Sequence, residues 1–146
     1  MIEKMIRKTI KNSMKLAVLV FVVGAFSSVA PLPVASAAQQ PAVTRKILLK
    51  HDSPVPGYEE DLVAVEIPPG GREGLHTHPG SLVVYVQQGT LTFYCEGKPL
   101  ATYHPGDSFY VEPDTVHEGR NIGKTPVKVL ATFVVKKGMP LTTQVH

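Results

Sequence analysis

Residues 70–89 read GGREGLHTHPGSLVVYVQQG, and the pattern in this stretch decides the fold. Gly70 and Gly71 indicate a sharp turn, because glycine adopts positive φ angles without steric cost. His76 and His78 follow, separated by one residue. In an extended strand, residues i and i+2 project from the same face. Both imidazoles can therefore reach one point if that face is interior.

A third histidine follows a second turn further along the chain. This segment begins at Pro105-Gly106-Asp107, passes through His117 and ends at Asn121. Neutral imidazole is a good ligand for Zn, Cu, Fe and Ni. We therefore expect His76, His78 and His117 to bind one divalent transition metal. The sequence leaves open whether that ion is Fe, Zn, Cu, Ni or Mn.

From Ala38 onward the chain consists of short segments rich in β-branched and aromatic residues, each closed by Gly, Pro, Asn or Asp. Short strands at regular spacing predict an all-β, antiparallel sandwich or barrel of the jelly-roll type. The expected strands are 45–50, 62–67, 82–87, 90–95, 100–104, 108–112, 116–120 and 127–135.

Two spaced motifs resemble those of the cupin superfamily. The first is Gly70, five residues, His76-Thr77-His78, three residues, Leu82, six residues and Gly89. The second is Gly106, five residues, Glu112 through His117, three residues and Asn121. The resemblance implies a double-stranded β-helix barrel that holds a metal inside one end. It implies that His76, His78 and His117 are the ligands.

The chain departs from this family at position 82. In many cupins a Glu of the first motif completes the ligand set, whereas this chain has Leu82. Three neutral imidazoles leave at least one coordination position open, as in catalytic rather than structural metal sites. Loss of the carboxylate favours imidazole-preferring ions over Mn. It also argues against a mechanism in which that carboxylate is the base.

Few other side chains suggest acid–base chemistry, and no catalytic residue is assigned. The flanking acids are expected to be solvated charges: Glu73, Glu112, Asp114 and Glu118. The other histidines lack ligand spacing and are expected in turns or on the surface: His51, His104 and His146. Tyrosines on the predicted strands are expected in the core: Tyr85, Tyr94 and Tyr110. Cys95 is expected to be a buried thiol.

The first 37 residues carry the features of an export signal. Five basic residues between Lys4 and Lys15 precede the apolar run 16–26, and small residues end in Ala35-Ser36-Ala37. This order is typical of a secretory signal peptide, with cleavage near Ala37 or Ala38. We therefore expect a periplasmic or secreted protein. An uncleaved membrane anchor at the leader is the alternative.

Removal of the leader changes the charge of the protein. It takes five of the 15 Lys and Arg and one of the 12 Asp and Glu, leaving ten basic and 11 acidic residues and a formal charge of −1. The remaining basic residues form no nucleic-acid-binding signature.

The length of the chain after the leader suits one domain. We expect a signal peptide at 1–37, an N-terminal extension at 38–60, the cupin barrel at 61–137 and a C-terminal tail at 138–146.

The strand at 82–86 is apolar on both faces. Its outer face is therefore expected to be covered by the N-terminal segment or by a second subunit, and we favour a homodimer.

The open three-histidine site favours a metal-dependent enzyme, dioxygenase-like or isomerase-like, acting on a small organic molecule. A non-catalytic binding module for a metal or metabolite is the alternative. A mainly structural protein is a third interpretation.

Overall fold

The computed structural model describes residues 40–145, so the expected signal peptide lies outside the described residues. All regular structure in this range is β-strand, and none of it is a helix that could cross a membrane. The strands are β1 (Thr44–Asp52), β2 (Tyr58–Ile67), β3 (His76–Thr77), β4 (Gly80–Gln88), β5 (Leu91–Cys95), β6 (Ala101–Tyr103), β7 (Ser108–Val111), β8 (His117–Arg120), β9 (Val127–Lys136) and β10 (Thr143–Gln144).

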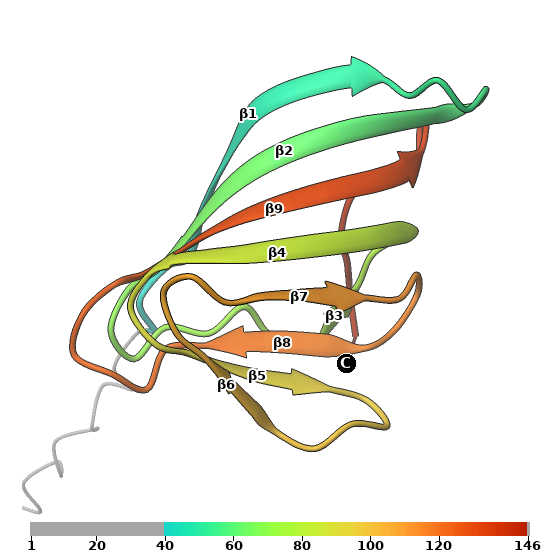
Figure 1. The fold of residues 1–146 in the computed structure, drawn as a ribbon. Helices are drawn as coiled ribbons and strands as arrows, with labels where there is room; N and C mark the ends of the chain where they lie inside the picture. Colours follow the sequence, from blue (N-terminus) through green and yellow to red (C-terminus); the bar gives the residue numbers. More distant parts are fainter. Residues whose placement is uncertain (1–39, 146) are drawn as a thin grey trace, which may run out of the picture. The chain divides into compact units, whose positions relative to one another are not determined.

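The strands form two five-stranded antiparallel sheets. One has the order β1-β2-β9-β4-β7 and the other the order β10-β3-β8-β5-β6. Figure 1 shows the first sheet lying over the second, and several neighbouring strands, such as β2 and β9 or β3 and β8, come from distant parts of the sequence. The predicted all-β jelly-roll barrel is confirmed. Its long-range pairings bring the two histidine segments together.

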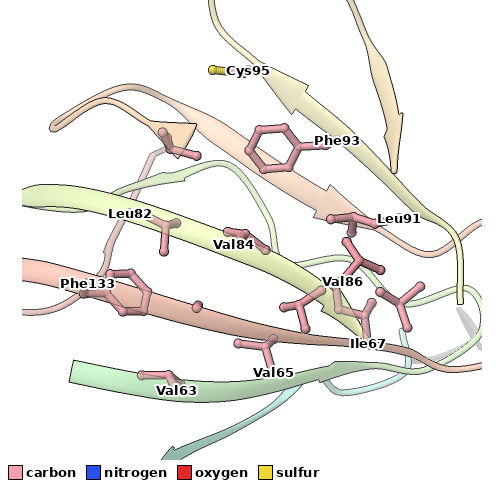
Figure 2. Packing of buried hydrophobic residues seen from close by; sticks show 14 of the residues in the cluster. Val63, Val65, Ile67, Leu82, Val84, Val86, Leu91, Phe93, Cys95 and Phe133 are labelled. Atoms are coloured by element: carbon pink, nitrogen blue, oxygen red, sulfur yellow. The ribbon is translucent and has the colours of Figure 1, made fainter. Parts of the chain in front are cut away.

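The core lies between the two sheets. Burial alternates along β2 and β9, as expected for strands with one covered face. Inward residues of β2 and β4 face Leu91 and Phe93 of β5, as Figure 2 shows. Each buried Val, Leu, Ile or Phe stabilises the fold by about 1.5–3 kcal/mol relative to an exposed one. The packed interior leaves a small cavity at the end of the barrel where the histidines lie.

All eight expected strands are present, with ends that differ by a few residues. The sequence did not indicate β3 and β10, which have two residues each and pair with one another. β1 lies in the expected N-terminal extension and pairs with β2 along its length. Both terminal segments therefore add strands to the sheets.

The outer face of β4 is more exposed than expected. Val83 and Tyr85 are 49% and 47% exposed. Within the described part of the N-terminal segment, β1 extends the sheet at its edge by pairing with β2 and does not cover this face. The described residues of the N-terminal segment therefore do not provide the expected cover. A second subunit at this face remains a prediction.

Gly80 is required for a reason that the turn pattern did not indicate. Its φ is not positive, but a Cβ at this position would lie 2.0 Å from the Val134 carbonyl oxygen. Any side chain there would force β4 away from β9. The expected positive φ angle occurs at Gly70 but not at Gly71, and positive φ angles also occur at Gly89 and Gly106.

Candidate metal centre

Three histidines from distant segments meet inside the barrel. His76 in β3 pairs directly with His117 in β8, and His78 follows β3. One ring nitrogen from each lies within 4.8 Å of the other two, and all three residues are buried. Atoms this close share a centre less than about 3 Å from each, whereas metal–imidazole bonds measure about 2.0–2.1 Å. Small side-chain movements therefore suffice to coordinate one ion.

Backbone carbonyls orient each imidazole through its Nδ1 atom. His76 Nδ1 lies 2.8 Å from Gly74 O, His78 Nδ1 2.6 Å from Leu141 O, and His117 Nδ1 2.8 Å from Thr115 O. A carbonyl oxygen only accepts hydrogen bonds, so each Nδ1 must carry the proton and donate it. Each Nε2 then has a free lone pair, as a metal ligand requires.

The lone pair of His117 has no partner among the residues that the structure describes. His117 Nε2 is buried and makes no hydrogen bond. An unpaired buried polar atom costs about 1–3 kcal/mol, so such atoms in proteins usually have a function. A metal ion at the shared centre would satisfy this atom, and the three-histidine set therefore fits a divalent transition metal.

The histidines are held in the neutral form that binds metals. Burial lowers the pKa of His76, His78 and His117, although the backbone carbonyl beside each ring opposes this effect. The pKa of His78 falls to about 3. Metal binding to these residues therefore does not have to displace protons at neutral pH.

The cavity beside the histidines is small and mostly apolar. The space open to water is about 50 Å³, which admits a few water-sized groups and no large ligand. Leu82 lines it, as expected, and Phe133 contacts the His78 ring with 4.8 Å between ring centroids. Figure 2 shows Leu82 and Phe133 on neighbouring strands. The charged residues that line the cavity are Arg45 and Glu73.

Two acidic residues expected to be solvated are not. Glu118 is fully buried and accepts hydrogen bonds from Arg72 Nε at 2.6 Å and Arg120 Nε at 2.5 Å. The Glu73 side chain is only 15% exposed and forms an ion pair with Arg45 at 2.8 Å. The expectation is wrong for both because each faces an arginine that shields it. For Glu118, the sequence signal was the presence of Arg72 and Arg120 within the two motifs.

Of the remaining predictions about burial, some are confirmed and others are wrong. Glu112 and Asp114 are exposed, as expected, and so are His51 and His104. His146 lies outside the described residues. Cys95 is buried, as expected. The expected core positions of Tyr85 and Tyr110 are wrong, since both rings are about half exposed on the outer face of the sheet, while Tyr94 is half-buried.

Glu118 links the turn before His76 to the strand that carries His117. Its Oε1 accepts a hydrogen bond from the Gly74 amide at 3.1 Å, and the Gly74 carbonyl orients His76. We expect Glu118→Ala to destabilise the fold by roughly 2–3 kcal/mol, less than for a fully buried ion pair because Arg72 and Arg120 remain hydrated. Metal affinity should fall about 10–100-fold.

Urea unfolding and cobalt titration measure these two effects. Glu112→Ala is the matched control, since Glu112 is exposed and should leave both values unchanged. Unchanged cobalt affinity in Glu118→Ala would show that Gly74 keeps its position without the buried carboxylate.

Comparisons with known proteins agree with the fold. Residues 63–133 match the family model described as "Cupin domain". An uncharacterized protein of Methanocaldococcus jannaschii is 29% identical over 96 residues, covering 61% of this chain and 70% of that protein. A cupin-like protein from Thermotoga maritima is similar in structure, with a TM-score of 0.59 and 21% identity over 70% of this chain and 75% of that chain.

An enzyme is also among the similar structures. DMSP lyase DddQ from Ruegeria pomeroyi has a TM-score of 0.54 and 21% identity, and the match covers 59% of this chain but only 43% of that one. At this identity the likeness concerns the fold alone. The fold is a double-stranded β-helix barrel, and three histidines converge inside it. This combination is typical of barrel proteins that bind a ligand or a metal in the interior. This chain belongs to the cupin superfamily.

Proposed function

We propose that this protein is an exported cupin that binds one divalent transition metal through His76, His78 and His117 and acts on a small organic molecule. The observation that carries the proposal is the set of three hydrogen bonds at Nδ1, which leaves the Nε2 lone pair of each imidazole free for a metal, on three histidines whose ligand nitrogens lie within 4.8 Å of one another. The leader sequence supports export.

The ligand set suits an ion that also binds a small molecule. Three protein ligands leave at least one coordination position for water or substrate. A metal bound there would polarise a substrate oxygen or lower the pKa of a bound water. The protein supplies rigid ligands and an apolar wall that limits access of water, and the small cavity favours a compact, partly apolar substrate with an oxygen donor. This chemistry suits a dioxygenase-like or isomerase-like reaction.

A binding module is the second candidate. The absence of a carboxylate at position 82 favours it, because the site lacks the acid that some relatives have there. In that case the ion would hold a metabolite without converting it.

Metal loading followed by a substrate panel tests the proposal. Protein stripped with a chelator should bind one equivalent of Fe(II), Cu(II), Ni(II), Mn(II) or Zn(II), measured by calorimetry and elemental analysis. Each loaded form is then incubated with phenols, diketones and thiols. Turnover that requires the ion supports the enzyme, and binding without product supports the module. Failure to bind any of these ions in stoichiometric amount would overturn both.

A substitution at position 82 tests the orientation of β4. Leu82 lines the cavity with the three histidines, so Leu82→Glu should add an oxygen donor and raise the affinity for Mn(II) or Fe(II) relative to Zn(II). The stripped variant should be less stable, because it buries a carboxyl group. Competition titrations measure the metal preference.

Leu82→Gln is the matched control, since it adds a polar group of similar size without the charge. An unchanged order of metal affinities in Leu82→Glu would mean that the new carboxylate does not reach the ion.

A further inference from the structure

Glu73 places a carboxylate in the metal cavity from an unexpected position. It lies three residues before His76, and its backbone amide donates to the Gly119 carbonyl at 3.0 Å. This bond ties it to β8, the strand that carries His117. Among the described residues that line the cavity, Glu73 is the only one with a carboxylate. The site that lacks an acid at position 82 therefore has one on another element.

The two carboxylate oxygens of Glu73 have different surroundings. Oε1 accepts a hydrogen bond from Arg45 Nη2 of β1 at 2.8 Å. Oε2 lies over Gly119, where a Cβ would come within 2.6 Å of it. The absence of a side chain at position 119 thus makes room for this oxygen. Arg45 holds the carboxylate by one oxygen and leaves the other nearer the strand of His117.

Glu73 is close to the metal ligands without being one of them. The group of mutually close ligand atoms contains the three histidines and no carboxylate oxygen among the described residues. A carboxylate in this position can exchange a proton with a molecule bound to the ion. The charged and titratable groups that act on it are Arg45 and His117.

The electrostatic surroundings agree with a role in proton transfer. Burial raises the pKa of Glu73, while the Arg45 guanidinium opposes this effect. Burial makes a carboxylate a better proton acceptor than a solvated one. The charge of Arg45 favours the ionised form of Glu73, which is the form that accepts a proton.

We propose that Glu73 is the proton acceptor of this site and that the site takes weak oxygen acids, such as hydroxyl, enol or hydroxamic acid compounds, which bind the ion as anions. The O–H bond of the ligand breaks, its electron pair stays on the oxygen, and the proton forms a new O–H bond on the Glu73 carboxylate. Arg45 is a positioning residue. This inference rests on the proposed metal site.

Counting protons during ligand binding tests the role of Glu73. The probe is acetohydroxamic acid, which is uncharged at neutral pH and binds metals as its anion. The protein is loaded with Co(II), and binding is measured by calorimetry at one neutral pH in buffers of different ionisation enthalpy. The wild-type protein should release about zero protons to the buffer, because Glu73 takes up the proton. Glu73→Gln should release about one.

Two controls make the outcome decisive. Glu112→Gln, at an exposed position, should behave like the wild-type protein. If Glu73→Gln does not fold, Glu73→Ala replaces it with the same expected release. Equal proton release in the wild-type protein and the Glu73 variant would overturn the role of Glu73, and so would release of about one proton by the wild-type protein. Failure of the wild-type protein to bind Co(II) would instead overturn the proposed metal site.

Discussion

Replacement of His117 by Ala is expected to abolish stoichiometric metal binding and to lower the affinity for Co(II) or Zn(II) by more than about 100-fold. Changes to groups that merely orient a ligand already cost 10–100-fold, so loss of the ligand itself should cost more. His117 supplies the only candidate ligand from the second sequence motif, and its Nε2 has no partner within residues 40–145. Calorimetry and the visible absorption of bound Co(II) measure the effect.

His104→Ala is the matched control for this variant. The His104 side chain is 64% exposed and belongs to no ligand group, so metal binding should not change. Circular dichroism checks that both variants are folded. Stoichiometric binding by His117→Ala at the affinity of the wild-type protein would contradict the assignment of the three-histidine site.

The metal-free protein is expected to lose stability steeply as the pH falls below about 6.5. The folded state lowers the pKa of His76, His78 and His117, whereas in the unfolded chain histidines titrate near 6.5. The unfolded chain therefore takes up protons first, and the stability that is complete above pH 6.5 is lost towards the folded pKa values. Each such histidine lowers the free energy of unfolding by about 1.4 kcal/mol per pH unit.

For His78, this loss of stability extends over the widest range of pH. Its folded pKa is about 3. The full difference from the unfolded chain corresponds to about 4–5 kcal/mol, a large share of the 5–15 kcal/mol that stabilises a typical domain. We therefore expect the metal-free protein to unfold in mild acid. Urea unfolding at several pH values between 7 and 4 measures the slope.

A variant at position 78 separates this effect from general acid denaturation. His78→Leu removes one group that takes up a proton on unfolding, so its stability should fall less steeply between pH 6.5 and 4. Because it also lacks a ligand, the comparison is made in the presence of a chelator. A flat stability profile of the wild-type protein over this range would show that the buried histidines do not control acid stability.

The strands could be predicted because their signals are local. β2 and β9 alternate between inward apolar and outward residues, and the segments end in Gly, Pro, Asn or Asp. β3 and β10 could not be predicted, because two residues carry no periodicity. They are strands only because the tertiary fold places residues 76–77 beside residues 143–144.

The convergence of the three histidines could be predicted, but the orientation of their rings could not. The spacing of His76 and His78 and the second motif around His117 indicated which side chains converge. The carbonyl that orients His78 belongs to Leu141, 63 residues further along the chain. Nothing in the sequence around either residue connects them. Hydrogen bonds between such distant residues depend on the path of the folded chain.

The burial of charged side chains also could not be predicted from the sequence. Glu73 and Glu118 were expected in water, because an isolated carboxylate is costly to bury. In the fold, Arg45 from β1 pairs with Glu73, and Arg72 and Arg120 pair with Glu118, which removes most of that cost. Whether an acid is buried depends on the partners that distant strands bring to it.

The sequence by itself determined the β-strands, the turns and the identity of the three histidines, because alternation, glycine conformation and residue spacing act over short distances. Only the tertiary structure decided which nitrogen of each histidine faces the cavity, which acids enter the site, and how little space remains beside them. These features arise from hydrogen bonds, ion pairs and packing between residues that become neighbours only when the two sheets close.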